Sequence, residues 1–566
     1  MSASSVAKRP LRQCKKEQRA ALVFAFVIAL FQSAFALNLS PTTAYQLSAA
    51  AAVLNGAVPF VSFYFDELPT QIVVRLPEVL LSWLWQYCPE SNGGAQLAIA
   101  HYLLTQVYQF FVFAFCLRIW RHSPGSSGGR PLLYLLAFMG AQLPFVFQLG
   151  CVQHLVFLGL LPLVFWGAVS EREEKESLSS ERRRDFVLAL LTASAAASLS
   201  LLCLPLPFLV VMAQALLLAR PSLLAWGGIA FALLPLILFG GFQLMPAACA
   251  SDLSQWILTL RASVYKVENM MVFGIGTSPD RRDFIYCLTA SLLLAFAGGR
   301  ERLLMIPLAV MAVWGFLVYT ISYSGLSDFL VLGYMSALVL LFCGCFAQVE
   351  MLTRIFPRLF FAVKRERRGL IPWVVVVPLW LGAVALPVWG SLMLTSQIKD
   401  EGAGLDAERG YIDLRRAIEE NSAPGERVFL LNGRLAPACP EILLSGRQNS
   451  SYFLSGEPLG LISNLVRQKV DGLWLARHSQ FVKETDELLA GRLKLDLEKD
   501  PPVCLLVEGG EMEDFLTRHG LRQWLNQCYE LKGHARYVSP CLAPREFCDW
   551  NWNYNIYVLK SRKDRP

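Results

Sequence analysis

The stretch "CVQHLVFLGLLPLVFWGAVS", residues 151–170, contains no Asp, Glu, Lys or Arg. A run of this length can cross the hydrocarbon core of a bilayer as a helix, because a helix satisfies its own backbone hydrogen bonds. The whole chain is similarly apolar: 55% of its 566 residues are hydrophobic, 17% are charged, and the mean hydropathy is +0.43. An ordinary soluble protein is more polar than this. The sequence therefore predicts an integral membrane protein.

Comparable apolar runs recur along the first two thirds of the chain, and we count about eleven helical spans. They cover residues 20–38, 100–118, 132–148, 151–170, 186–203, 205–220, 222–245, 283–298, 302–322, 328–348 and 371–396. The fifth and sixth runs meet at "LCLPLPF", where Pro205 and Pro207 mark either a tight turn or a kink within one longer helix.

Basic residues predict the orientation of these spans, because cytoplasmic loops keep Lys and Arg. The N-terminal segment 1–19 is rich in Lys and Arg, whereas the loop 39–99 contains only Arg75. The N-terminus is therefore expected in the cytoplasm, and the first run lacks a cleavage pattern, so it is read as a retained span. The prediction is a multi-pass membrane protein. Most of the net charge of +7 belongs to such anchors, so we expect contact with membrane lipids and no nucleic acid.

Three regions follow from this topology. Residues 1–19 form a cytoplasmic N-terminal segment, residues 20–396 form the multi-span domain with its outer loop 39–99, and residues 397–566 form an extracytoplasmic domain. The predicted fold class is mostly α, with a C-terminal α/β domain.

The α/β prediction for the tail rests on local patterns. "YIDLRRAIEENSAPGERVFLLNG", residues 411–433, is typical of an amphipathic helix, a Pro-Gly turn and a strand that ends at Asn432-Gly433. "VDGLWLA" and "VCLLVEG" are two further short apolar runs bounded by turn residues, and "EMEDFLTRHGL" predicts a helix. Five cysteines of the tail favour one or two disulfides on the outer side, and their spacing fits no zinc pattern, so no metal site is predicted.

The loop between the first two spans carries two adjacent acids, Asp66 and Glu67, within "NGAVPFVSFYFDELPTQ", residues 55–71. An Ala-rich helix ends before them at Asn55-Gly56. "IVVRLPEVLLSWLWQY", residues 72–87, follows them and has the apolar and Trp residues of a helix that lies along the outer membrane interface. Both carboxylates are therefore expected at the lipid headgroups.

This order of helix, Gly, "VPF", aromatic pair, acid, Pro and interfacial helix resembles the first outer loop of the GT-C superfamily of integral membrane glycosyltransferases. The bacterial relatives of protein mannosyltransferases and of lipid A aminoarabinose transferases belong to it. The segment "FQLGCVQHLVFLGLLPLVF", residues 147–165, and the start of the tail, residues 411–453, resemble further segments of one bacterial branch. In the former, Gly150, His154, Leu155 and Pro162 match.

The chain also departs from the pattern of that superfamily. No acid follows the first span directly, and Ser62 stands where the branch has an Asp. "GCVQHL" lacks the Arg and Glu of the matching segment, and Leu206-Pro207 replaces a Lys-Pro pair.

The resemblance implies transfer of a sugar from a polyprenyl-phosphate carrier to an envelope glycan, lipid or protein acceptor at the outer face of a bacterial plasma (inner) membrane. A carboxylate acts there as the general base for the acceptor hydroxyl, and cationic groups stabilise the departing phosphate. We predict Asp66 as this base, with Glu67 second. The predicted substrate-binding residues are Arg75, His154, Arg261 and Lys266. No cofactor beyond the donor is implied, and a divalent cation stays open.

Simpler interpretations stand beside these. Asp66 and Glu67 also suit a solvated turn, Arg75 and Glu78 are spaced to pair with each other at the surface, and His154 also suits a structural role. The alternative function is a catalytically degenerate relative that binds a polyprenyl or glycan lipid in envelope assembly. A transporter is disfavoured, because neither paired repeats nor ionisable residues in the middle of spans are evident.

Overall fold

The computed structural model of the protein describes residues 11–34, 39–57, 69–85, 93–121, 130–146, 148–169, 180–220, 222–229, 302–322, 331–355, 411–433, 437–454, 456–467, 473–538 and 551–560, with the single residues 289 and 378. The described chain is mostly helical, as predicted. It divides into two compact units. The first comprises residues 1–35, 103–239 and 276–390, and the second comprises residues 36–102, 240–275 and 391–566.

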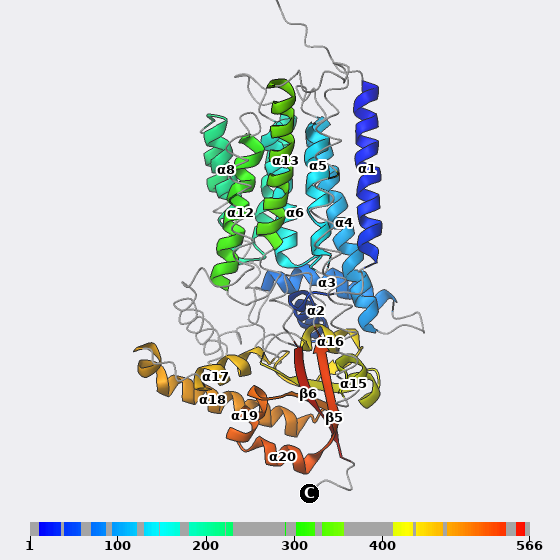
Figure 1. Ribbon diagram of the computed structural model, residues 1–566, viewed down its shortest axis with the longest axis vertical. Helices are drawn as coiled ribbons and strands as arrows, with labels where there is room; N and C mark the ends of the chain where they lie inside the picture. The colour runs from blue at the N-terminus through cyan, green and yellow to red at the C-terminus, as the bar shows by residue number, and fades with distance from the viewer. Residues whose placement is uncertain are drawn as a thin grey trace, which may run out of the picture. The chain divides into compact units, whose positions relative to one another are not determined.

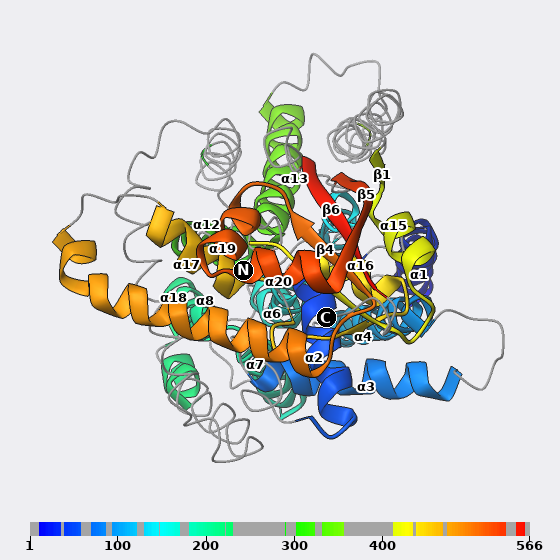
Figure 2. The ribbon, with the colours of Figure 1, turned by 90° about the horizontal axis from the view of Figure 1, so that it is seen from below.

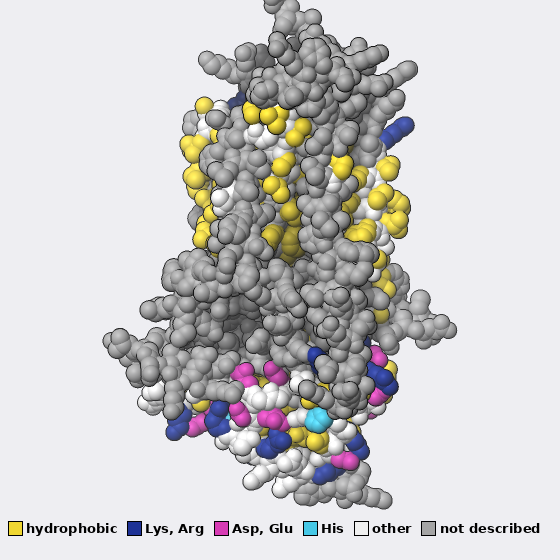
Figure 3. Space-filling view, viewed as in Figure 1, with side chains coloured by type: hydrophobic (Ala, Val, Ile, Leu, Met, Phe, Trp, Pro, Cys, Tyr) yellow, Lys and Arg dark blue, Asp and Glu magenta, His cyan; other side chains and the backbone are white. Residues whose placement is uncertain are grey.

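Apolar helices build the first unit, and they run alongside one another in Figure 1. They are α1 (Leu11–Ser33), α4 (Gly93–Arg121), which enters this unit at Leu103, α5 (Arg130–Gly140), α6 (Val152–Val169), α7 (Ser180–Ala197), α8 (Leu206–Leu217), α12 (Arg302–Ser322) and α13 (Val331–Ile355). Side chains such as Phe26 on α1, Phe111 on α4 and Leu216 on α8 are more than 60% exposed. Hydrophobic side chains line these helices in Figure 3. Lipid tails, rather than water, suit such a surface.

Three helices of the described chain are long and apolar enough to cross a membrane, which is consistent with the predicted membrane class. They are Gly94–Arg121, Val152–Val169 and Val331–Leu352. Shorter apolar helices occur at Leu22–Ser33, Leu206–Leu217 and Leu303–Val318. The count of about eleven spans stays a prediction, since the runs 222–245, 283–298 and 371–396 lie largely outside the described residues.

The structure shows how the helices are interrupted at two proline-containing segments. "LCLPLPF" is a turn between two helices: α7 ends at Ala197, a 3-10 turn η2 (Leu201–Cys203) follows, and Pro205 is the N-cap of α8. The run 132–148 is not one continuous helix, because α5 ends at Gly140 and the 3-10 turn η1 (Leu143–Phe145) follows. Pro144 has no backbone N–H to continue an α-helix across this point.

Small residues allow the helices of the first unit to approach closely. A Cβ on Gly315 of α12 would lie 2.4 Å from the backbone nitrogen of Gly333 on α13. A Cβ on Gly159 of α6 would lie 2.2 Å from the Cβ of Ala196 on α7. Helices in lipid associate through such van der Waals packing. The hydrophobic effect does not drive their association, because the surrounding acyl chains are as apolar as the helix surfaces.

The second unit contains a six-stranded sheet, seen from below in Figure 2. Its strands, in the order β1-β5-β6-β4-β2-β3, are β1 (Tyr411–Asp413), β5 (Tyr529–Val538), β6 (Asn551–Leu559), β4 (Cys504–Glu508), β2 (Arg427–Leu431) and β3 (Gln448–Asn449). The β5–β6 and β6–β4 pairs are antiparallel, and the other pairs are parallel.

Helices pack on both faces of this sheet, because side chains alternate along each strand. Phe429 and Leu431 of β2 lie in a core with α17 (Glu457–Arg467), α18 (Leu473–Lys499), α19 (Glu511–Arg518) and α20 (Leu521–Cys528). Val428 and Leu430 lie in the opposite core with α15 (Leu414–Asn421) and α16 (Ala438–Leu444). In the short apolar run "VDGLWLA", the described residues from Leu473 onward lie in α18 and do not form a strand. The other short apolar run, "VCLLVEG", contains β4.

Asp413 begins α15 as its N-cap by accepting a hydrogen bond of 3.0 Å from the backbone nitrogen of Arg415. The turn before β2 contains Gly425 with a φ of +81°, a conformation that favours glycine. Of the five tail cysteines, Cys504 and Cys528 are free, the Cys439 thiol lies 3.9 Å from the carbonyl oxygen of Leu454, and the other two lie outside the described residues.

The second unit also contains α2 (Pro41–Leu54), α3 (Pro69–Trp85) and the first turns of α4. Helix α16 packs against α2, and it also meets the start of α4. A Cβ on Gly94 would lie 2.0 Å from the carbonyl oxygen of Leu443 and 2.7 Å from the Cα of Leu444. Only glycine permits this contact, which joins the helices of the first loop to the sheet.

We expect Gly94→Ala to destabilise the second unit by about 1–3 kcal/mol, because the backbone of α16 must move to admit the methyl group. Thermal unfolding of the full-length protein in detergent measures this effect. The matched control is Gly491→Ala in α18, where a Cβ meets nothing within 4 Å and the melting temperature should stay equal or rise. Equal melting temperatures for Gly94→Ala and the unmodified protein would contradict the close contact.

Candidate functional site

The sequence-predicted site residues fall into three groups. Asp66, Glu67, Arg261 and Lys266 lie outside the described residues. Arg75 lies on α3 in the second unit, and His154 lies on α6 in the first unit. Arg75 and His154, the two predicted residues that the structure describes, are therefore considered separately.

Helix α2 supplies the support behind Arg75, and its sequence explains where it begins and ends. Ser40 is the N-cap: its hydroxyl accepts a hydrogen bond of 3.3 Å from the backbone nitrogen of Thr43, and Pro41 occupies the first helical position. The helix ends at Leu54, and Gly56 follows with a φ of +84°. Most of α2 is buried, so Gln46 on it faces protein rather than solvent.

Helix α3 has two opposite faces of unusual character. Val73, Pro77, Leu80 and Leu84 follow a helical spacing and are all exposed, with Leu84 at 70%. The polar residues have the same spacing on the other face and are all buried: Gln71, Arg75, Glu78 and Ser82. A helix that turns its apolar face outward and its charges inward is suited to a membrane interface, where the outer side meets acyl chains.

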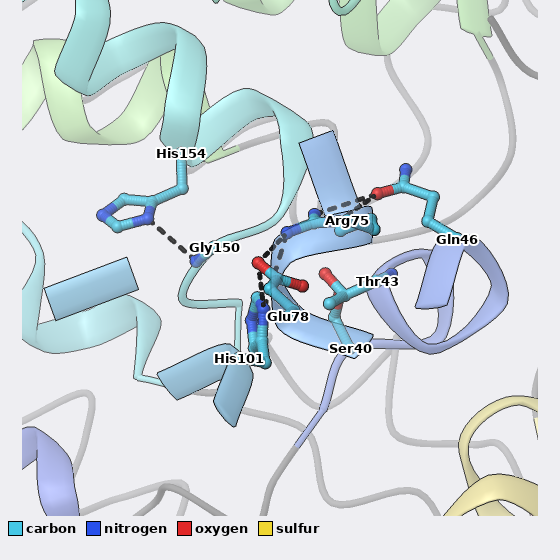
Figure 4. Close-up of polar contacts among 8 residues, drawn as sticks. All are labelled: Ser40, Thr43, Gln46, Arg75, Glu78, His101, Gly150 and His154. Carbon is cyan, nitrogen blue, oxygen red and sulfur yellow. Dashed lines mark hydrogen bonds and ion pairs between the residues drawn. The ribbon is translucent and has the colours of Figure 1, made fainter. Parts of the chain in front are cut away.

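Arg75 is the centre of the buried polar face, and its side chain is 0% exposed. Its Nη1 donates to Glu78 Oε1 at 3.1 Å, while its Nε and Nη2 donate to Gln46 Oε1 at 3.1 and 2.9 Å. Gln46 in turn donates from Nε2 to Gln71 Oε1 at 2.9 Å. Figure 4 shows Gln46 of α2 converging with Arg75 and Glu78 of α3.

His101 adds a third helix to this network. It lies in the first turns of α4, is 3% exposed, and places its Nδ1 3.1 Å from Glu78 Oε1. A proton on Nδ1 then donates to the carboxylate. Glu78 Oε1 therefore accepts hydrogen bonds from both the Arg75 guanidinium and the His101 imidazole. We call Gln46, Gln71, Arg75, Glu78 and His101 the loop cluster.

The charges of the loop cluster determine the ionisation of Glu78. Burial raises the pKa of this carboxyl, but the charge of Arg75, the electrostatic attraction of the His101 ring and the hydrogen bonds from both outweigh burial, and its pKa lies below the ordinary value of 4.5. Glu78 is therefore an anion at neutral pH. The predicted pairing of Arg75 with Glu78 exists, but the pair is buried and not at the surface.

Glu78 Oε2 differs from Oε1. It is buried, and no donor of the described chain forms a hydrogen bond with it. Figure 4 shows this part of the carboxylate on the side of Thr43, whose hydroxyl oxygen accepts a hydrogen bond of 2.9 Å from the Ser40 hydroxyl. A buried carboxylate oxygen without a donor is costly, so it marks a position where a further donor would be stabilised.

His154 occupies the first unit, and both of its ring nitrogens are engaged. Nδ1 accepts a hydrogen bond of 2.9 Å from the backbone nitrogen of Gly150, so the proton lies on Nε2, which is 3.1 Å from Gln142 Oε1. Gly150 has a φ of +74°, and the histidine holds this turn before α6. This geometry suits the structural interpretation of His154 and leaves neither nitrogen for a phosphate.

Four members of the loop cluster, Gln46, Gln71, Glu78 and His101, were not predicted as site residues, and Glu78 was expected only as a surface partner of Arg75. His101 had a detectable signal, since an ionisable residue near the end of an apolar span often serves a function. Gln46 and Gln71 had none, because a glutamine in a helix is ordinarily a surface residue.

Comparisons with known proteins identify no relative of the chain: no family model, no curated protein and no solved structure matches it. Within the described ranges, no group of three or more His, Cys, Asp and Glu side chains is arranged to hold a metal ion.

The loop cluster can orient a polar ligand, because it holds one cation, one anion, two amides and an imidazole in fixed positions on three helices. Arg75 is engaged with Glu78 and Gln46, so its charge is largely compensated. Glu78 is a hydrogen-bond acceptor, and its lowered pKa makes it a weak base.

We expect Arg75→Met and Glu78→Leu each to destabilise the protein by about 3–5 kcal/mol, because each leaves the partner charge buried alone. The double variant should lose much less than the sum, since both charges are removed together. Unfolding of the full-length protein in detergent measures all three.

The control for this cycle is the exposed pair of Arg416 and Glu420 on α15, for which the same substitutions should change stability by less than about 1 kcal/mol. Additive losses in the Arg75 and Glu78 variants would show that the two side chains do not depend on each other.

Proposed function

We propose that the protein is a membrane glycosyltransferase of the GT-C type, which moves a sugar from a polyprenyl-phosphate carrier to an envelope glycan, lipid or protein acceptor. The observation that carries this proposal is α3: a helix with an exposed apolar face and a buried, ionised polar face, joined by a short connection to the candidate span in α4. A lipid-linked sugar needs such a place, because its tail stays in hydrocarbon while its polar end enters protein.

The composition of the second unit supports the proposed topology. Described residues between 36 and 102 share this unit with those after 391, and α16 contacts both α2 and α4. Segments so far apart in the chain can pack together only on one side of a membrane. The positive-inside rule assigns that side to the exterior. We therefore propose an extracytoplasmic α/β domain at residues 397–566, about eleven spans, and a cytoplasmic N-terminus in a bacterial plasma membrane.

In the proposed reaction, the acceptor hydroxyl oxygen forms a bond to the anomeric carbon while the bond from that carbon to the carrier phosphate breaks. Polyprenyl phosphate leaves, and the hydroxyl proton passes to a carboxylate. We assign this base to Asp66, with Glu67 second, because both directly precede α3 in the chain and the only basic residue of the loop 39–99 is Arg75. Arg75, Arg261 and Lys266 remain the proposed substrate-binding residues, whereas the hydrogen bonds of both His154 ring nitrogens favour its structural role.

A second function is a non-catalytic module that binds a polyprenyl or glycan lipid. The specific observation in its favour is the engagement of the two described cationic candidates: Arg75 is paired with Glu78, and both nitrogens of His154 have partners. A binding module needs no general base, so this function also accommodates the departures from the GT-C pattern.

Cysteine labelling in intact cells tests the orientation. We expect Glu420→Cys on α15, an exposed site, to react with a membrane-impermeant maleimide, and Arg183→Cys on α7, also exposed, to react only after the membrane is permeabilised. The unmodified protein gives the background from its native cysteines. The reverse labelling pattern would place the tail in the cytoplasm and contradict the proposed reaction at the outer face.

Sugar transfer in membranes tests the base. We expect Asp66→Ala to lower transfer from a polyprenyl-phosphate sugar by about 10²- to 10⁴-fold, Glu67→Ala to lower it less, and the double variant to abolish it. Glu487→Ala, an exposed carboxylate on α18, is the control and should not change the rate. Unchanged transfer in the double variant refutes the base assignment. Absence of transfer by the unmodified protein with every donor favours the binding module.

A further inference from the structure

We propose that Glu78 binds the sugar of the lipid-linked donor, with its Oε2 accepting a hydrogen bond from a hydroxyl or ammonium group of that sugar. This inference rests on the proposed function and assigns to the loop cluster a sugar-recognition role in place of phosphate recognition. Glu78 then determines which donor is selected, and Arg75 positions Glu78.

The first argument is the asymmetry of the Glu78 carboxylate. Oε1 receives Arg75 Nη1 and His101 Nδ1, both at 3.1 Å, whereas Oε2 has no hydrogen-bond donor in the described part of the chain. Glu78 is 4% exposed, so water does not compensate this oxygen freely. A ligand group that donates to Oε2 would complete the site, because hydrogen bonds to a charged, buried acceptor are among the stronger ones.

The second argument is charge. In the loop cluster, Arg75 contributes one positive charge and Glu78 one negative charge, Gln46 and Gln71 are neutral amides, and the His101 ring carries a charge only when it is protonated. A phosphate brought beside Glu78 would be repelled by the carboxylate and would compete with it for Arg75. A hexose or pentose ring carries no net charge, and an amino sugar carries a positive one. Both kinds of sugar can donate a hydrogen bond to a carboxylate oxygen that lacks a donor.

The third argument is the arrangement of donors and acceptors. Sugar hydroxyls both donate and accept, and the cluster offers amide, imidazole and carboxylate groups from α2, α3 and α4. The hydroxyls of Ser40 and Thr43 lie on the Oε2 side of Glu78 (Figure 4). The outward face of the same α3 is apolar, so polar and lipid contacts are separated by the width of one helix.

Ligand-induced thermal stabilisation of the full-length protein in detergent tests the inference. The probes are a polyprenyl phosphate without sugar and the same carrier bearing a hexose, a pentose or an amino sugar. At least one sugar-bearing carrier should raise the melting temperature more than the bare carrier, because tighter binding to the folded state stabilises it.

Glu78→Gln should remove this extra stabilisation and weaken the apparent affinity for the sugar-bearing carrier at least tenfold. The stabilisation by the bare carrier should stay unchanged. An amino sugar should lose more than a hexose, since an amide can still bind a hydroxyl but cannot pair with an ammonium. Asp185→Asn is the matched control: Asp185 is a buried carboxylate paired with Arg118 at 3.1 Å in the first unit, and it should leave the extra stabilisation intact.

The outcomes separate the two proposals. Equal stabilisation of the unmodified protein by bare and sugar-bearing carriers overturns the role of Glu78 and leaves the proposed function in place. No stabilisation by any carrier overturns the proposed function itself. If Glu78→Gln does not fold, Glu78→Asp, which retains the charge but shortens the side chain, must show the same selective loss, and an unchanged response in that variant overturns the inference.

Discussion

The buried ion pair of Arg75 and Glu78 is the contact on which the inner structure of the second unit depends. Two charges are stable in a dry interior only when each is paired and hydrogen-bonded. Gln46 on α2 and His101 on α4 supply those hydrogen bonds, so the pair joins three helices. The same arrangement leaves α3 free to expose only apolar side chains on its other face. Its polarity is inverted relative to a helix on the surface of a soluble protein.

Besides the ion pair of Arg118 with the buried Asp185, the first unit meets the same constraint with neutral groups. Its buried polar contacts include amides and one imidazole, such as Gln109 with Gln142, His154 with Gln142, and Gln106 with Gln32 at 2.8 Å. In a bilayer core a neutral hydrogen bond costs less to bury than an ion pair. The contrast with the loop cluster is informative, because charge is retained there at greater cost. The retained charge is what makes the loop cluster, rather than the glutamine contacts, the candidate site.

Much of the fold was predictable, because long apolar runs and turn residues act locally. The candidate spans at 94–121, 152–169 and 331–352 follow from apolar length alone, and α15 follows from Asp413 and an amphipathic pattern. The end of α5 at Gly140 was missed, because an apolar run does not reveal a Pro-induced break. Helix α18 was missed at Leu473, since a short apolar run fits a strand or a buried helix equally.

The candidate site was predictable only in part, for a physical reason. The spacing of Arg75 and Glu78 indicated a pair, but nothing local distinguishes a surface pair from a buried one. Burial is decided by α2 and α4, which lie about thirty residues away in the chain. Gln46 became recognisable only through its contact with Arg75. Residues whose role is set by distant partners carry no signal of their own in a single sequence.

Glu78 cannot also serve as the general base of a sugar transfer. A base must hold the proton of the acceptor hydroxyl in the transition state, and a carboxylate whose pKa is lowered by Arg75 and His101 holds it weakly. The features that make Glu78 a good acceptor for a ligand therefore make it a poor base. Proton removal requires a carboxylate less compensated by positive charge. In the loop that carries the cluster, Asp66 and Glu67 are acids with no basic residue beside them in the sequence, which is why we propose that the two roles are divided between carboxylates of this loop.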